Sequence, residues 1–272
     1  RIEACTRAVY IGPDNLIVTG RTMDWKEDIM SNLYVFPRGI QRAGYNKGET
    51  VTWTSKYGSV IATGYDIGTC DGMNEKGVSI AVLTLDSEPV HQDTGKPVIT
   101  TTLAIRLVLD RAATTQEAVE LLRQYDMFAS SGRDYHFYIT DATGDGRVIE
   151  YDCESEAREL VAVPINAITN FYGLYKEKVL PDQRNGIYGH GRERYDAVLD
   201  VFEQQSGNYT DDTVWAALIA ASQEPNPESI TSNTQWSIAY NNTDLTADIV
   251  IRRHWSDITH YGLTTNETTW TQ

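Results

Sequence analysis

Two short runs rich in apolar residues at the start of the chain, separated by a turn cluster, predict a hairpin. Strands are expected over 6–11 and 16–20, joined by the Gly-Pro-Asp-Asn turn at 12–15. The second strand continues into Arg21 and Asp24. Because partners in a hairpin face each other, we expect both side chains to lie beside Cys5, where the first strand begins.

The strand pattern continues through the first third of the chain. Short apolar runs at 33–36, 51–54 and 59–65 predict further strands. The run at 77–85 is almost unbroken, which is typical of a strand that is covered on both faces. The segment 66–76 is rich in Gly, Asp and Asn and is predicted as turns, and 86–98 is predicted as loop.

The apolar period then becomes helical. Helices are predicted over 100–113 and over 114–124, the second with Thr114 as its N-cap. The remaining expected elements are strands at 135–140, 148–151, 160–163 and 165–169, helices at about 192–204 and 213–221, and strands at 235–240 and 247–252. The polar tail from Thr264 is predicted to fray.

This order of elements predicts an α+β fold. Many hairpins and few parallel crossovers indicate antiparallel sheets that are layered with helices. The chain has 272 residues and shows no internal repeat, low-complexity tract or linker. We therefore expect one domain over 5–272, with 1–4 as a propeptide or the remnant of a leader.

Charge and composition limit the classes of partner. The chain carries 23 Lys and Arg against 38 Asp and Glu, a formal net charge of -15. Such a field repels nucleic acids and anionic membrane surfaces. No apolar run approaches the length of a transmembrane helix, so stable membrane insertion is not expected. The localisation is left open between the cytoplasm and export, the latter if 1–4 ends a leader.

Cysteines and histidines give no metal pattern. The three cysteines, at positions 5, 70 and 153, are too few for a disulfide framework and leave at least one free thiol. The five histidines are dispersed and no Cys-x-x-Cys occurs. We therefore expect no zinc site and no cofactor.

Cys5 is the candidate nucleophile. If 1–4 were removed, this residue would carry a thiol, with a pKa near ~8.5, and an α-amine, with a pKa near ~7.7–8.0. The amine could then take the proton from its own side chain. Position alone leaves two alternatives open: a buried structural cysteine, or the lipid anchor of a non-catalytic secreted binding protein.

Four other polar residues could support such chemistry. Arg21 would favour the thiolate, and Asp24 could hold the α-amine through a hydrogen bond. Asn170 ends a predicted strand and could donate to an oxyanion, a contribution on the order of 3–4 kcal/mol. Arg194 lies near a helix start. Each residue type also occurs as a surface charge or a turn former, so the spacing alone is not diagnostic.

Taken together, five stretches make the sequence resemble the choloylglycine hydrolase family, which includes bile salt hydrolases and penicillin V acylases. They are Cys-Thr-Arg at 5–7, Arg-Thr-Met-Asp-Trp at 21–25, Asp-Gly-Met-Asn-Glu-Lys-Gly at 71–77, Thr-Asn at 169–170 and Arg-Tyr at 194–195. The similarity is strongest over 5–85. It implies an N-terminal nucleophile hydrolase with a four-layer αββα sandwich.

The resemblance also implies roles for single residues. Cys5 would be the nucleophile once its amine is exposed, flanked by Arg21 and Asp24. Asn170 would supply an oxyanion-hole amide, and Arg194 would support the charge network. The backbone N–H of Thr84 would complete the oxyanion hole, at a position where many bile salt hydrolases carry Asn and some penicillin acylases carry Tyr.

The implied reaction is hydrolysis of a linear amide C–N bond in a small acyl amide. Conjugated bile salts are the first expected substrate, and penicillin V or fatty-acyl amides are the alternative. Trp25, Phe171, Tyr172 and Trp236 could line an apolar acyl pocket, or they could be core residues. The resemblance implies a homo-oligomer, although the chain is shorter than typical members after Gly173, where relatives carry an extended hairpin used for assembly.

Overall fold

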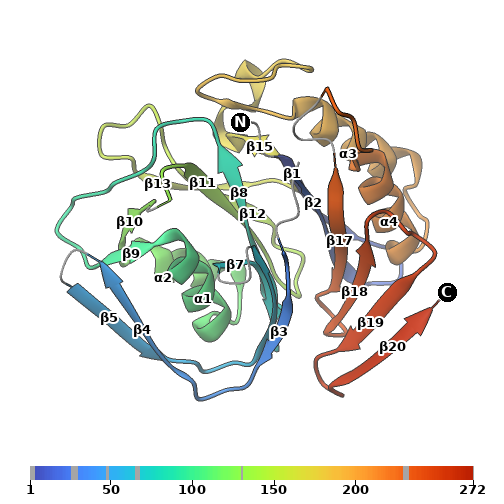
Figure 1. Cartoon of the computed structure of the whole chain (residues 1–272), viewed down its shortest axis with the longest axis horizontal. Coiled ribbons are helices and arrows are strands. Elements are labelled where there is room, and N and C mark those ends of the chain that lie inside the picture. The colour runs from blue at the N-terminus through green and yellow to red at the C-terminus, as the bar shows by residue number, and fades with distance from the viewer. Residues whose placement is uncertain are drawn as a thin grey trace.

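The computed structural model describes residues 4–25, 30–46, 49–64, 68–129, 131–228 and 233–271. Within these ranges the chain forms four layers (Figure 1): two sheets face each other, and a pair of helices covers the outer face of each. The predicted α+β class and αββα sandwich are confirmed. None of the described helices is long and apolar enough to cross a membrane.

The first sheet is antiparallel and contains the predicted N-terminal hairpin. Its order is β14 (Ala167–Ile168), β1 (Ala4–Ile11), β2 (Ile17–Asp24), β17 (Thr234–Asn241), β18 (Thr246–Ile251), β19 (Ile258–Gly262) and β20 (Glu267–Thr271). The β1–β2 register places Cys5 opposite Met23 and Arg7 opposite Arg21. The hairpin therefore brings two arginines to the start of the chain.

Helices α3 (Arg192–Gln204) and α4 (Thr210–Ala221) cover the outer face of this sheet. Close packing of α4 depends on Gly20 in β2, because a Cβ at that position would lie 2.8 Å from Val214 Cγ1. Side chains from both helices join the core cluster that includes Cys5. The helix layer thus fixes the strand on which Cys5 stands.

The second sheet faces the first. Its order is β13 (Leu160–Pro164), β12 (Arg147–Tyr151), β11 (Asp134–Thr140), β8 (Ser79–Leu85), β7 (Gly68–Asn74), β6 (Ser59–Gly64) and β3 (Leu33–Phe36). Along β8, Ala81 and Leu83 pack in the core between the sheets, whereas Ile80 and Val82 pack toward the outer helices. The strand is buried on both faces, as its apolar run predicts.

Helices α1 (Thr101–Arg111) and α2 (Thr115–Arg123) cover the outer face of the second sheet. Thr114 caps α2, as predicted, by accepting a hydrogen bond from the Glu117 N–H at 3.1 Å. The smaller elements are β4 (Gln41–Asn46) paired with β5 (Glu49–Thr54), β9 (Val98–Thr100) with β10 (Asp126–Phe128), β15 (Asn170–Phe171) with β16 (Gly189–His190), and the 3₁₀ helix η1 (Gly173–Lys178).

Two predictions about segments were wrong. The segment 66–76 was predicted as turns, but 68–74 forms β7 inside the second sheet, between β6 and β8. Gly72 is needed there because a Cβ would lie 2.8 Å from the Val60 carbonyl oxygen and from Leu109 Cδ1. The tail was predicted to fray, but 267–271 pairs along its whole length with β19. Tertiary pairing overrides the weak strand propensity of both segments.

Candidate active site

The thiol of Cys5 lies at the start of β1, inside the sandwich. Arg21 Nη2 donates a hydrogen bond to Cys5 Sγ at 3.2 Å, and Met23 Sδ lies 3.7 Å from the same sulfur. Cys5 is 5% exposed. Burial alone would suit a structural cysteine, but a guanidinium on the sulfur is an arrangement that favours the thiolate.

Arg21 belongs to a buried group of charges, here called the Asp71 cluster, formed by Arg7, Arg21 and Asp71. The two arginines are directly opposite each other on β1 and β2, where like charges repel. Asp71, on β7 of the facing sheet, receives Arg21 Nη1 at 2.8 Å and Arg7 Nη2 at 3.4 Å. All three side chains are 0% exposed. One carboxylate thus joins both sheets directly behind Cys5.

The electrostatic balance differs between the two arginines. Burial lowers the pKa of Arg7 below its ordinary value. Burial acts on Arg21 in the same direction, but the Cys5 sulfur and the Asp71 carboxylate outweigh it and raise the pKa of Arg21. Arg21 is therefore a permanent cation held against the sulfur.

The backbone of Cys5 is held by two predicted site residues. The Cys5 N–H donates to Asn170 Oδ1 at 2.8 Å, and Arg194 Nη1 donates to the Cys5 carbonyl oxygen at 2.7 Å. Arg194 Nη2 also donates to Asn170 Oδ1 at 3.0 Å. Asn170 comes from β15 and Arg194 from the first turn of α3, so side chains far apart in the sequence meet at the backbone of one residue.

Two glycines make this meeting sterically feasible. Gly191, the N-cap of α3, has a φ of 88°, and a Cβ there would lie 2.3 Å from Arg194 Nη2. Gly189, on the strand paired with β15, has a φ of 105°, and a Cβ would lie 2.1 Å from the Asn170 carbonyl oxygen. Only glycine accommodates both the positive φ and the close approach.

Thr84 and Asn170 are in direct contact. Asn170 Nδ2 donates to the Thr84 carbonyl oxygen at 3.0 Å and lies 3.2 Å from Thr84 Oγ1. Among the described residues, the pairing between β7 and β8 ends at Ala81. The part of β8 that carries Thr84 is therefore not paired with β7. The two residues expected to contribute to an oxyanion hole therefore meet at the end of this strand.

Asp24 lies at the end of β2, opposite Ala4. Its carboxylate accepts a hydrogen bond from Thr234 Oγ1 at 2.7 Å and a longer one from Gln223 Nε2 at 3.4 Å. Burial raises the pKa of Asp24 to about 6, although Arg194 and the Thr234 hydrogen bond act in the opposite direction. The carboxylate is thus placed beside the peptide bond that precedes Cys5.

The four aromatic residues expected to line a pocket fall into two groups. Trp236 packs in the hydrophobic core beside Arg21, whose guanidinium lies 5.6 Å from the indole ring centroid. Trp25 is partly buried and packs against the same hydrophobic core. Phe171 and Tyr172 are 0% exposed. They are core residues in this structure and have no exposed surface with which to line a pocket.

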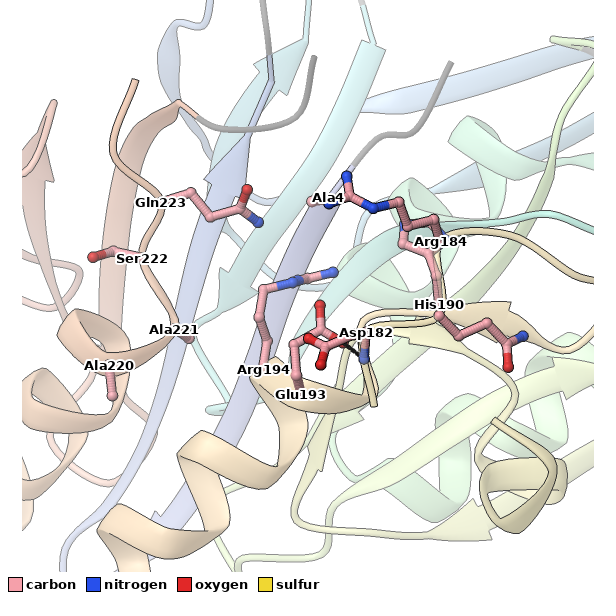
Figure 2. Close-up of a pocket in the computed structure, with 11 residues that line it drawn as sticks. Ala4, Asp182, Arg184, His190, Glu193, Arg194, Ala220, Ala221, Ser222 and Gln223 are labelled. Carbon is pink, nitrogen blue, oxygen red and sulfur yellow. Dashed lines mark hydrogen bonds between the residues drawn. The ribbon is translucent and has the colours of Figure 1, made fainter. Parts of the chain in front are cut away.

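A pocket of about 310 Å³ borders the site (Figure 2). Ala4 and Arg194 form part of its wall, and the Arg194 guanidinium extends from α3 toward Ala4. The remaining lining is largely polar and consists of Asp182, Gln183, Arg184, His190, Glu193, Ala220, Ala221, Ser222 and Gln223. The pocket therefore lies at the N-terminal side of Cys5, where the chain enters β1.

The other two cysteines differ from Cys5 in their surroundings. Burial raises the pKa of Cys70 to about 12 and also raises the pKa of Cys153, so both thiols stay neutral near pH 7. Among the described residues, no group of three or more His, Cys, Asp or Glu side chains could hold a metal ion.

The sequence reasoning missed Asp71 and Arg7. Asp71 was quoted only as part of a motif, in a segment predicted as turns. The available signal was a charged residue just before a fully buried strand, because a buried carboxylate needs a cationic partner. Arg7 stood in a predicted strand, two residues after Cys5, where the alternation of a strand places it on the same face.

The sequence model described as linear amide C-N hydrolases, choloylglycine hydrolase family, matches residues 5–157, more than half of the chain. The chain belongs to this family, which supports an amidohydrolase. A penicillin V acylase of Pectobacterium atrosepticum is 39% identical over 166 residues, which are 54% of this chain and 44% of that protein. The matched region is thus less than half of that relative's length.

Solved structures match over nearly the whole chain. The penicillin V acylase from Agrobacterium tumefaciens has a TM-score of 0.79 and 27% identity, covering 96% of this chain and 86% of that chain. A variant of the conjugated bile acid hydrolase from Clostridium perfringens has a TM-score of 0.76 and 18% identity, covering 98% of this chain and 96% of that chain. The second likeness concerns the fold alone.

Proposed function

We propose that the protein hydrolyses a linear amide by means of Cys5, acting as an N-terminal nucleophile after cleavage of the Ala4–Cys5 peptide bond. The observation that carries this proposal is the convergence on one residue: Arg21 on its sulfur at 3.2 Å and Asn170 on its nitrogen at 2.8 Å. Neither contact is needed to bury an ordinary core cysteine.

The reaction then proceeds in two halves. The α-amine of Cys5 takes the thiol proton, Sγ attacks the amide carbonyl carbon, and a tetrahedral oxyanion forms. The amine returns the proton to the leaving nitrogen as the C–N bond breaks, which leaves a thioester on Cys5. Water, deprotonated by the same amine, attacks the thioester and releases the acid and the free thiol. Arg21 stabilises the thiolate at the start and at the end.

The oxyanion is assigned to the Thr84 backbone N–H and to Asn170 Nδ2. A side-chain amide has two N–H donors, and in this structure Nδ2 faces both Thr84 oxygens. Donation to a substrate therefore requires that one Thr84 contact be given up. The Thr84 Oγ1 contact, at 3.2 Å, is the longer of the two and is the one we expect to yield.

The remaining polar residues orient the nucleophile. Asp24 lies opposite Ala4, where it can accept a hydrogen bond from the new α-amine. Arg194 fixes the Cys5 carbonyl. Removal of Ala4 would also remove part of the wall of the adjoining pocket, and would thereby give solvent and substrate access to the Cys5 nitrogen.

For the substrate, we propose aryl-acyl amides of the penicillin V type ahead of conjugated bile salts. Both relatives described above that share more than 25% identity with this chain are penicillin V acylases. The bile acid hydrolase described above shares 18% identity. Trp236, beside Arg21, and Trp25, which packs against the core cluster that includes Cys5, would provide the apolar surface that such an acyl group would contact.

The test has two measurements on the purified chain. Intact mass should show a protein that begins at Cys5. A panel of penicillin V, conjugated bile salts and N-acyl amino acids should then show hydrolysis by the native protein, with penicillin V as the best substrate, and none by Cys5→Ala. An uncleaved chain that is fully active, a lipid on Cys5, or turnover that persists in Cys5→Ala would contradict the proposal.

A further inference from the structure

His136 lies in the core beneath the strand that carries Asn170. It stands on β11, and Glu150 stands on the neighbouring strand β12; both side chains are 0% exposed. His136 Nδ1 is 2.8 Å from Glu150 Oε2, and Nε2 is 2.9 Å from the carbonyl oxygen of Thr169. That carbonyl belongs to the same peptide plane as the Asn170 nitrogen, so the contact acts on the backbone of a site residue.

A partner of the ring fixes one of its hydrogens. A carbonyl oxygen can only accept, so His136 Nε2 carries a hydrogen. Glu150 Oε2 accepts a hydrogen bond from the Gly173 N–H at 2.8 Å, and Oε1 accepts one from the Leu174 N–H at 2.9 Å. The ring is therefore held at both nitrogens, at Nε2 by the Thr169 carbonyl and at Nδ1 by a carboxyl group that the backbone fixes in place.

Stability alone does not explain a buried polar pair of this kind. Well-packed apolar residues of similar volume serve a core as well or better, because the desolvation of buried polar groups offsets their attraction. The pair at His136 and Glu150 instead gives a directional donor to one carbonyl group.

Thr169 transmits the constraint to both residues that hold Cys5. Its hydroxyl donates to the carbonyl oxygen of Gly191 at 2.7 Å, and Gly191 is the N-cap of the helix that carries Arg194. Its carbonyl is fixed by His136. Thr169 thus ties the Asn170 strand to the start of α3, while Arg194 Nη2 closes the loop by donating to Asn170 Oδ1.

We propose that His136, held in place by Glu150, is a positioning residue that aims the Asn170 side chain at Cys5 and Thr84. The inference rests on the proposed function in so far as it concerns turnover. It acts through the Thr169 carbonyl, without contact to the substrate. Loss of the donor frees the 169–170 peptide to rotate and moves the Asn170 amide off the site.

The kinetic test compares His136→Phe, which keeps a ring but donates nothing, with His136→Gln, which keeps one donor. Leu122→Ala, on the buried face of α2, is the destabilised control. His136→Phe should lose up to about 100-fold in kcat with little change in KM, because a misplaced donor weakens transition-state binding. His136→Gln should retain more of kcat, and Leu122→Ala all of it. Equal kcat in His136→Phe and Leu122→Ala would overturn the proposal.

Two further measurements do not depend on turnover and are made in the Cys5→Ala chain. Nitrogen-15 spectra of labelled histidine should show a hydrogen on His136 Nε2, the nitrogen that faces the Thr169 carbonyl. Crystals of His136→Phe should show Asn170 Oδ1 beyond hydrogen-bond distance of residue 5 N, against 2.8 Å in the parent. A His136 Nε2 without a hydrogen in the parent, or an unmoved Asn170, would overturn the positioning role. A native chain inactive on every amide would instead overturn the proposed function.

Discussion

Among the described residues, two clusters each have one buried carboxylate that receives two guanidinium groups. The first is the Asp71 cluster, between the two sheets. The second, here called the Asp110 cluster, consists of Arg106 and Asp110 on α1 and the partly buried Arg42 on β4. Asp110 Oδ1 receives Arg106 Nη2 at 2.9 Å, and Oδ2 lies 3.3 Å from Arg42 Nε. Both clusters place guanidinium groups against aromatic rings: Trp236 in the first and Phe36 in the second.

The two clusters differ in what stands beside the arginines. Burial and the neighbouring Arg42 lower the pKa of Arg106 to about 10, despite Asp110. Burial also lowers the pKa of Arg21, but the Cys5 sulfur and the Asp71 carboxylate together outweigh burial, so the pKa of Arg21 is raised. A buried cluster of two cations and one carboxylate carries excess positive charge, and only the Asp71 cluster directs that excess at a thiol. The comparison teaches that the same arrangement of charges can stand beside aromatic rings alone in one place and beside the proposed nucleophile in another.

The strongest way to break the comparison is to neutralise each carboxylate in turn. Asp71→Asn and Asp110→Asn should each lower the free energy of unfolding by roughly 3–5 kcal/mol, because each leaves buried cations unpaired. Activity should separate them: we expect a loss of at least about 100-fold in kcat for Asp71→Asn, as Arg21 loses its orientation. Asp110→Asn should keep kcat at temperatures where it is folded.

Urea unfolding and kinetics on the preferred amide are the measurements. If Asp71→Asn does not fold, Arg7→Met provides the second variant, since it removes one cation but leaves the Arg21–Asp71 contact of 2.8 Å. Equal retention of kcat in Asp71→Asn and Asp110→Asn would show that the Asp71 cluster is structural only.

A third buried carboxylate, Asp24, sharpens the comparison because it has no ion pair within 4.0 Å among the described residues. Burial raises its pKa from 3.8 to about 6, so the folded state binds the proton more tightly than the unfolded state. The stability from Asp24 is thus full below pH ~4 and is lost as pH rises through about 6. The loss is on the order of 3 kcal/mol.

The measurement is the free energy of unfolding of Cys5→Ala with and without Asp24→Asn, from pH 4 to pH 7. Asn does not titrate, so the variant should gain stability relative to its parent as the pH rises. A difference between the two chains that stays constant across this range would contradict the assigned environment of Asp24.

Two glycines at opposite ends of α3 form a matched pair: Gly191 lies beside the site, and Gly207 follows the other end of the helix. Gly191 and Gly207 have φ values of 88° and 91°, so alanine at either position costs about 1–2 kcal/mol. At Gly191 the added Cβ would also meet Arg194 Nη2 at 2.3 Å, whereas nothing lies within 4 Å at Gly207. Gly191→Ala should therefore lose activity as well as stability, and Gly207→Ala stability alone. Thermal unfolding and kcat of both variants measure this, and equal kcat values would refute it.

The smallest expected effect concerns the reactivity of the thiol. Arg21→Met should slow alkylation of Cys5 by iodoacetamide at pH 7 by about tenfold, because the sulfur loses the cation that favours its thiolate. Arg106→Met, in the Asp110 cluster, should leave the rate unchanged. Mass spectrometry of the peptide that contains Cys5 follows the reaction, and identical rates in both variants would remove the electrostatic role of Arg21.

Much of the fold could be predicted from local patterns. The β1–β2 hairpin is encoded by two short apolar runs and a turn cluster, and α2 by an apolar face with the cap Thr114. The strand β7 could not be predicted because its Gly, Asp and Asn residues look like turns when read alone. They suit a strand only because Gly72 meets Leu109 and Asp71 meets two arginines from the facing sheet.

The candidate site shows the same limit. The proximity of Arg21 to Cys5 follows from the hairpin, and the structure also brings Asn170 and Arg194 to the Cys5 backbone. Aromatic residues could not be sorted, because Trp236 and Phe171 are both apolar and only packing decides which lies beside Arg21. Charges buried between layers, such as Asp71, are visible only when the two sheets are seen together.

The central claim is that the Cys5 sulfur becomes covalently acylated during turnover. The most direct measurement is mass spectrometry of the native protein quenched in acid while it hydrolyses its best amide. We predict an added mass equal to the acyl group, on the peptide that begins with Cys5 and bound through sulfur. Turnover without an adduct, under conditions where release of the acyl group limits the rate, would contradict the account. An adduct on any other residue would also contradict it.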